Sequence, residues 1–95
     1  MAVLKATKKG PKLFRFDLHK SGGKKSKLTF EGGTAVRNLA AGKYMLIWVV
    51  EGLEGQTFSY SVTLDDKKIE EQKDAEISDA GWETGGIPLE VEDEE

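Results

Sequence analysis

Apolar and polar residues alternate with a period of two along most of the chain. Residues 12–18 and 57–64 show the pattern most clearly. One face of each stretch is apolar throughout, with Phe14, Phe16 and Leu18 in the first and Phe58, Tyr60, Val62 and Leu64 in the second. Because successive side chains of a β-strand point to opposite faces, this alternation predicts half-buried antiparallel strands.

Further strands are predicted over Val3–Lys8, Lys27–Glu31, Lys67–Glu71 and Ile87–Val91, and a short extended piece over Thr34–Asn38. Pro88 lacks an N–H group, so the last of these strands is expected at a sheet edge. Ala35–Ala41 is too short for an independent helix, and Ile69–Ile77 has no apolar stripe. The chain is therefore expected to contain little or no helix.

The stretch Tyr44–Val50 departs from simple alternation because both of its faces are apolar. Tyr44, Leu46, Trp48 and Val50 would share one face, and Met45, Ile47 and Val49 the other. Such a strand is expected at the centre of a sheet, covered on both sides. The alternative is that one face pairs with another chain.

Turn residues divide these stretches at Gly10-Pro11, Ser21-Gly22-Gly23, Gly52–Gly55 and Asp65-Asp66. We expect a hairpin at the second position, and a hairpin loop at Gly52–Gly55. Seven to eight short strands with frequent turns indicate an all-β fold, an antiparallel β-sandwich, with a small β-barrel as the alternative. We expect one domain over residues 1–91 and an acidic, frayed tail over residues 92–95.

One motif carries a family resemblance. Leu39, Gly42 and Tyr44 stand in the order Leu-x-x-Gly-x-Tyr directly before the most apolar strand. This resembles the tyrosine corner of immunoglobulin-like and transthyretin-like sandwiches, in which the tyrosine hydroxyl bonds to backbone a few residues upstream. The resemblance implies that Tyr44 is buried, with its hydroxyl bonded within Leu39–Gly42. Leu46 stands where antibody domains have a core cysteine.

Composition narrows the chemistry further. The 95 residues include no cysteine, which excludes disulfides, thiolate metal sites and a cysteine nucleophile. No apolar run approaches the length of a membrane-spanning helix, and Met1–Lys5 does not begin a signal peptide. These features predict a cytoplasmic protein with no membrane partner, or a secreted one if a signal had been removed.

Charge is divided unevenly between the two halves of the chain. Residues 1–43 carry eleven lysines and arginines against two acids, and residues 44–95 carry three lysines against fifteen acids. The net charges are thus +9 and −12, which sum to the overall −3. We expect the halves to lie side by side and neutralise each other. The alternative is that the basic segment 5–27 binds nucleic acid or another polyanion.

No catalytic constellation is evident in the sequence. His19 is the single histidine, and no nucleophile elbow surrounds a serine. We expect His19 to be a solvated surface residue and the protein to be neither an enzyme nor dependent on a cofactor. Whether Asp65, Asp66, Glu70 and Glu71 bind calcium is left open, because their spacing is not that of an EF-hand.

The sequence therefore favours a non-catalytic binding or structural module whose partner is a protein or carbohydrate. Nucleic acid is the less favoured partner, and the chain is expected to be a monomer or weak dimer. The candidate contact residues are Trp82, Lys24, Lys25, Lys27 and Arg15. Trp82 is either an exposed anchor or, as we prefer, a lid folded over an open end of the sandwich.

Overall fold

The structure is a computed structural model and describes residues 2–92. Within this range it contains eight strands and no helix, so it has no helix that could cross a membrane. The strands are β1 (Ala2–Lys9), β2 (Leu13–Lys20), β3 (Lys25–Lys27), β4 (Thr34–Leu39), β5 (Gly42–Glu51), β6 (Thr57–Leu64), β7 (Lys67–Glu76) and β8 (Trp82–Val91). Of the expected acidic tail, only Glu92 belongs to the described residues.

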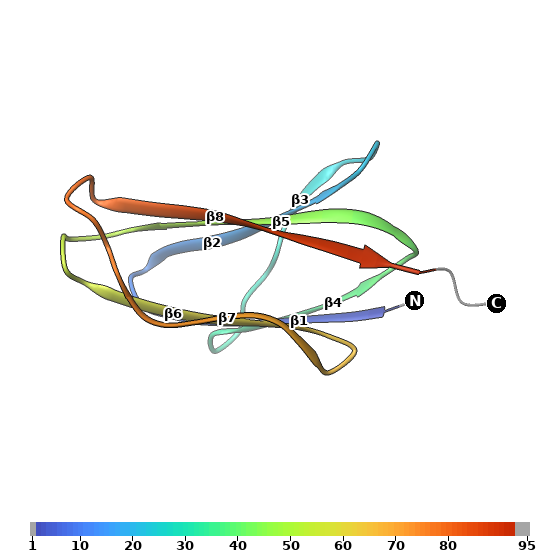
Figure 1. Ribbon diagram of the computed structural model, residues 1–95, viewed down its shortest axis with the longest axis horizontal. Coiled ribbons are helices and arrows are strands. Elements are labelled where there is room, and N and C mark those ends of the chain that lie inside the picture. Colours follow the sequence, from blue (N-terminus) through green and yellow to red (C-terminus); the bar gives the residue numbers. More distant parts are fainter. Residues whose placement is uncertain (1, 93–95) are drawn as a thin grey trace.

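The strands form two antiparallel sheets of four that are not closed into a barrel. One sheet has the order β4-β1-β6-β7, and the other has the order β3-β2-β5-β8. Figure 1 shows them as two layers, with β1 beginning and β8 ending at the same end of the molecule. The all-β, two-sheet prediction is confirmed. Pro88 lies in β8, an edge strand of its sheet, as its missing N–H requires.

Between the strands of residues 2–92, two connections are hairpins, β2–β3 and β6–β7. The hairpin expected at Gly52–Gly55 is wrong, because β5 and β6 belong to different sheets and this loop crosses between them. The β6–β7 turn is made by Asp65 and Asp66, with φ of 50° and 66°. This left-handed geometry is typical of a two-residue hairpin turn.

The strand predicted over Lys27–Glu31 is also wrong in its position. The structure ends β3 at Lys27, and the chain then crosses to the other sheet. Leu28 is nonetheless buried and Phe30 packs against the core. A crossing segment can thus show the same apolar alternation as a strand, because both aim alternate residues inward.

The core lies between the two sheets and is rich in aromatic rings. The ring centroids of neighbouring pairs lie 5.1–6.2 Å apart. The six residues are Phe14, Phe16, Phe30, Trp48, Phe58 and Tyr60. Pairs such as Phe14–Phe58 and Phe16–Tyr60 meet edge to face across the interlayer, an arrangement that adds to the stabilisation from area burial alone.

The corner predicted at Tyr44 is confirmed. Tyr44 is 8% exposed, and its hydroxyl donates a hydrogen bond of 2.7 Å to the backbone carbonyl of Ala40. Leu39 is buried beneath it, and Gly42 has φ of 149°, a conformation that L side chains rarely adopt. The bond anchors the connection from β4 in one sheet to β5 in the other.

Candidate functional site

The outward-facing residues of the β3-β2-β5-β8 sheet form the candidate site, called the β5 outer face below. Alternation with buried neighbours places them on this side of the sheet. They are Leu13, Arg15, Asp17, His19, Lys25, Lys27, Lys43, Met45, Ile47, Val49, Glu51, Trp82, Thr84, Gly86, Pro88 and Glu90.

The centre of the β5 outer face is apolar and uncovered. Met45 is 40% exposed, and Ile47 and Val49 are half-buried. The expectation that both faces of Tyr44–Val50 are covered is therefore wrong. The strand is central in its sheet, but no described part of the chain lies over its outer side, because the second sheet packs against the inner side alone.

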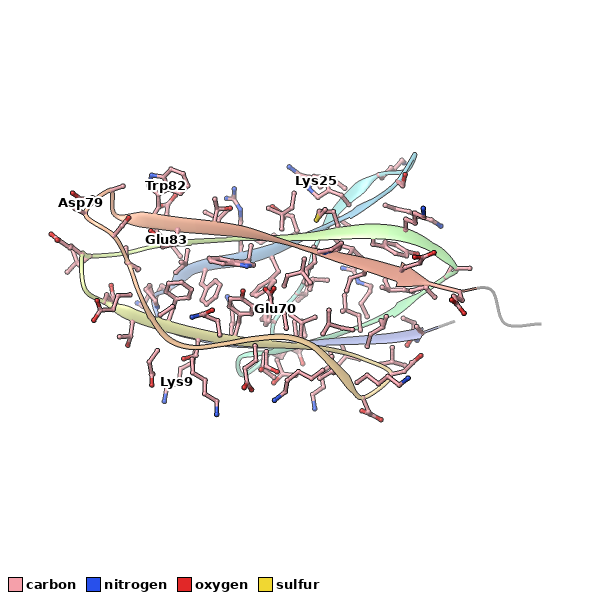
Figure 2. The ribbon with its side chains drawn as sticks, viewed as in Figure 1. Lys9, Lys25, Glu70, Asp79, Trp82 and Glu83 are labelled. Carbon is pink, nitrogen blue, oxygen red and sulfur yellow. The ribbon has the colours of Figure 1, made fainter. Side chains whose placement is uncertain are left out.

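Two large apolar residues extend this surface at the end where β2 and β8 begin. Leu13 is 65% exposed and Trp82 is 51% exposed, and both are in register with Glu51 of β5. In Figure 2, Trp82 projects away from the interior of the sandwich. The preferred expectation of a lid over the open end is therefore wrong, because Trp82 already belongs to β8 and its strand geometry points it outward.

The predicted basic residues lie along one margin of the same face. Lys25 is in register with His19, and Lys27 with Asp17, while Lys24 belongs to the β2–β3 turn. Arg15 Nε lies 3.5 Å from Asp17 Oδ2, an exposed pair of the kind that contributes about 0–1 kcal/mol. The structure thus places all five predicted contact residues around one sheet, with Trp82 at the corner opposite the lysines.

The basic margin is held in place by hydrogen bonds from a residue of the other sheet, Arg37. Arg37 of β4 donates to Ser26 Oγ at 2.9 Å and to the Lys27 carbonyl at 3.0 Å. These bonds position the three-residue strand β3, which is too short to be fixed by its own ladder with β2. Sequence reasoning had no means of assigning this role, because Arg37 and β3 meet only through the fold.

A groove of about 480 Å³ opens beside the first half of β2. Its walls come from residues 12–15 at the start of β2, from residues 27–30, from Lys8 of β1 and from Val49 and Glu51 of β5. The Lys8 ammonium donates to the Phe14 carbonyl and lies 4.6 Å from the Phe30 ring centroid. Burial, and then the positive charge of Lys27, lower the pKa of Lys8 below its ordinary value.

Three of the four carboxylates considered for calcium have other partners. Asp65 Oδ1 accepts from the Val3 amide at 2.8 Å, and Glu71 pairs with Lys68 at 3.2 Å. Glu70 accepts from the Tyr60 hydroxyl at 2.6 Å between the sheets (Figure 2). Burial and this carboxylate raise the pKa of Tyr60 well above its ordinary value. Among residues 2–92 no group of three His, Cys, Asp or Glu residues could hold a metal ion.

No family model, no curated protein and no solved structure matches this chain.

Proposed function

We propose that the protein is a non-catalytic interaction module whose working surface is the β5 outer face. The observation that carries the proposal is the uncovered apolar side of its most apolar strand, Met45, Ile47 and Val49. A contiguous apolar patch of this kind, bordered by charged residues, marks an interaction site more often than a scattering of single exposed apolar residues.

A protein partner fits this surface better than a carbohydrate. The middle of the face offers aliphatic side chains, a thioether and the flat backbone around Gly86, with few side-chain hydrogen-bond donors. Sugar recognition depends on a dense set of such donors and acceptors. A second sheet or an apolar protein surface, by contrast, buries aliphatic groups without leaving polar groups unpaired.

We infer that the partner is a second copy of this chain. The β3 margin of the face carries Lys25 and Lys27, and the β8 margin carries Glu90. A two-fold axis parallel to the strands would reverse the strand order of the facing sheet and lay the basic margin of each copy over the acidic margin of the other. Across the sheet, Lys25 is in register with Pro88 through His19 and Met45. Glu90 is the next outward-facing residue after Pro88 along β8, so it lies close to this level of the sheet.

The tyrosine corner supports a relationship with immunoglobulin-like sandwiches, and it enters this proposal only as a scaffold. The Tyr44 bond fixes the beginning of β5 and so the orientation of its two faces. A cytoplasmic location stays a prediction from the sequence.

Sedimentation equilibrium over micromolar to millimolar concentrations tests the proposal. The native chain is expected to dimerise, and Ile47→Glu is expected to abolish this by placing a charge in the centre of the patch. Val36→Glu is the matched control, because Val36 is 62% exposed on the outer side of the other sheet. A native chain that stays monomeric, or equal effects of both substitutions, would refute the inferred partner.

A charge exchange tests the arrangement itself. Lys25→Glu and Glu90→Lys are each expected to weaken self-association by about fivefold. In a dimer of either variant, both of the symmetry-related contacts between positions 25 and 90 would join like charges. An equimolar mixture of the two variants is expected to recover the native affinity, because both contacts in the mixed dimer then join opposite charges. Failure of the mixture to recover affinity would exclude the proposed axis.

A further inference from the structure

The groove beside β2 lies where the sheet is incomplete. The strand β3 pairs with β2 only from Asp17 to His19. Leu28 then donates its N–H to the Phe16 carbonyl at 3.0 Å, and the chain crosses to the other sheet. The edge of β2 from Leu13 to Arg15 therefore has no neighbouring strand, and the groove of about 480 Å³ follows it. This volume is within the range of small-molecule sites.

The charge in this groove is strongly unbalanced. Four of its residues are cationic, Lys8, Lys12, Arg15 and Lys27, and one is acidic, Glu51. Within residues 2–92, only Arg15 among these cations forms an ion pair. Lys8, Lys12 and Lys27 therefore have no ion-pair partner among residues 2–92, and Glu51 is the one carboxylate in the groove lining.

Lys8 is held in place at the inner wall of the groove. Its ammonium group lies 4.6 Å from the Phe30 ring centroid and 5.6 Å from that of Phe14, and it donates to the Phe14 carbonyl. These contacts fix a long side chain that would otherwise lose conformational entropy on binding a ligand. A second cation, Lys27, lies close enough to disfavour the charged form of Lys8.

We propose that this groove binds a compact oxyanion, that is, a carboxylate, sulfate or phosphate group on a small ligand, with Lys8, Lys12 and Lys27 as its charged contacts. Such a group would balance the positive charge of the lining and would accept hydrogen bonds from the ammonium groups of these lysines. The groove shares Lys27, Arg15 and Leu13 with the margin of the β5 outer face, whereas Lys8 and Lys12 lie outside that face.

Two other occupants fit the groove less well. An added peptide strand would have to bond to the Phe14 carbonyl at the free edge of β2. That carbonyl already accepts a hydrogen bond from Lys8, which the strand would have to displace. A nucleic acid would need a continuous track of cations. Lys5 and Lys9, the neighbours of Lys8 in the basic segment, instead project from the outer side of the other sheet, as Figure 2 shows for Lys9.

The test is a titration of the isotopically labelled protein with pyrophosphate, followed by amide and lysine side-chain NMR. Sodium chloride of equal ionic strength is the reference. Saturable shifts are expected at the groove, from Lys12 to Arg15 and from Lys27 to Phe30. The pKa of Lys8 is expected to rise on saturation, because a bound anion favours the ammonium form.

Matched variants identify the contacts. Lys8→Met keeps the apolar packing against Phe30 and is expected to weaken binding about tenfold, equivalent to about 1.4 kcal/mol. Lys12→Gln, at an exposed position, is expected to weaken it severalfold even if Lys8→Met perturbs the fold. Lys9→Met is the control on the same strand and should leave the affinity unchanged. Ile47→Glu should also leave it unchanged, because Ile47 lies at the centre of the β5 outer face and does not line the groove.

Three results would overturn the proposal. The first is that chloride reproduces the shifts, which would indicate general screening only. The second is that Lys9→Met weakens binding as much as Lys8→Met does. The third comes from a parallel titration with a short oligothymidylate. Tighter binding than that of pyrophosphate, with shifts extending to Lys5 and Lys9, would replace the compact-anion site by a nucleic-acid surface.

Discussion

The two faces of β5 are equally apolar in sequence and lie in different environments. On the inner side, Leu46 and Val50 are fully buried and Trp48 is 8% exposed. On the outer side, Met45 is 40% exposed and its neighbours are half-buried. The inner side is covered by the β4-β1-β6-β7 sheet, whereas no described residue of the chain forms a layer over the outer side.

The corresponding strand of the other sheet, β6, differs from β5 in its outer side. In β6 the inward-facing residues are Phe58, Tyr60 and Val62, and the outward-facing residues are serine and threonine. A polar outer side is therefore compatible with the fold, so the folded monomer does not require an apolar outer side on β5. The proposed self-association would account for the apolar outer side of β5, and the following substitutions compare the packing of its two faces.

The largest expected effect is on the inner side. Leu46→Ala removes a fully buried side chain and should lower the free energy of unfolding by about 2–5 kcal/mol through lost burial and a cavity. Ile47→Ala, one residue later, should cost less than about 1.5 kcal/mol, because its side chain already contacts solvent. Urea denaturation at low protein concentration measures both. Equal losses would mean that the two faces are equally packed.

Two adjacent glycines of β8 give a matched pair across the same two faces. A Cβ at Gly85 would lie 2.7 Å from the Trp48 indole, which is held between aromatic rings. Gly85→Ala should therefore destabilise by about 1–3 kcal/mol, as overpacking does. A Cβ at Gly86 would meet only the flexible end of Met45, at 3.2 Å.

Gly86→Ala is thus expected to change stability by less than about 1 kcal/mol. Thermal and urea unfolding of both variants, compared with the native chain, give the difference. A Gly86→Ala variant that loses as much as Gly85→Ala would show that the outer side is as tightly packed as the inner side.

The beginning of β5 offers a smaller test of the inner side. Tyr44→Phe removes the hydroxyl that bonds to Ala40 and keeps the ring in place. It should cost about 1–2 kcal/mol, with little change in the denaturant slope. The Ala40 carbonyl is at an exposed residue and can recover part of the loss by bonding to water. A neutral Tyr44→Phe would remove the energetic argument for a tyrosine corner.

Much of the fold could be predicted from local pattern. Alternation located most strands, Pro88 indicated an edge, and the spacing of Leu39, Gly42 and Tyr44 located the corner. Each of these signals arises within a few residues, from strand geometry, a missing N–H or one side-chain bond to nearby backbone.

What could not be predicted depends on which distant segments meet. The alternation of Leu28 and Phe30 is the same in a strand and in a crossing segment, and Gly52–Gly55 suits a hairpin or a crossover equally well. Lys8 and Phe30 line the groove only because β1 packs beside the segment after β3. The apolar outer side of β5 was visible in the sequence, but coverage by a second layer is a property of the whole sheet arrangement.

The smallest expected change in stability gives the sharpest test of the outer side. Val49→Thr keeps the shape and the preference for β-structure while making one half-buried outer position polar. At concentrations where the chain is monomeric, the free energy of unfolding should stay within about 0.5 kcal/mol of the native value. Self-association should nevertheless weaken by about threefold, because a hydroxyl would be buried at the contact between the two copies. Val36→Thr, on the other sheet, should change neither quantity.

Because association stabilises the folded state by mass action, native and Val49→Thr unfolding curves should diverge as concentration rises. Curves that stay superimposed at all concentrations would show that the apolar outer side of β5 makes no contact between copies.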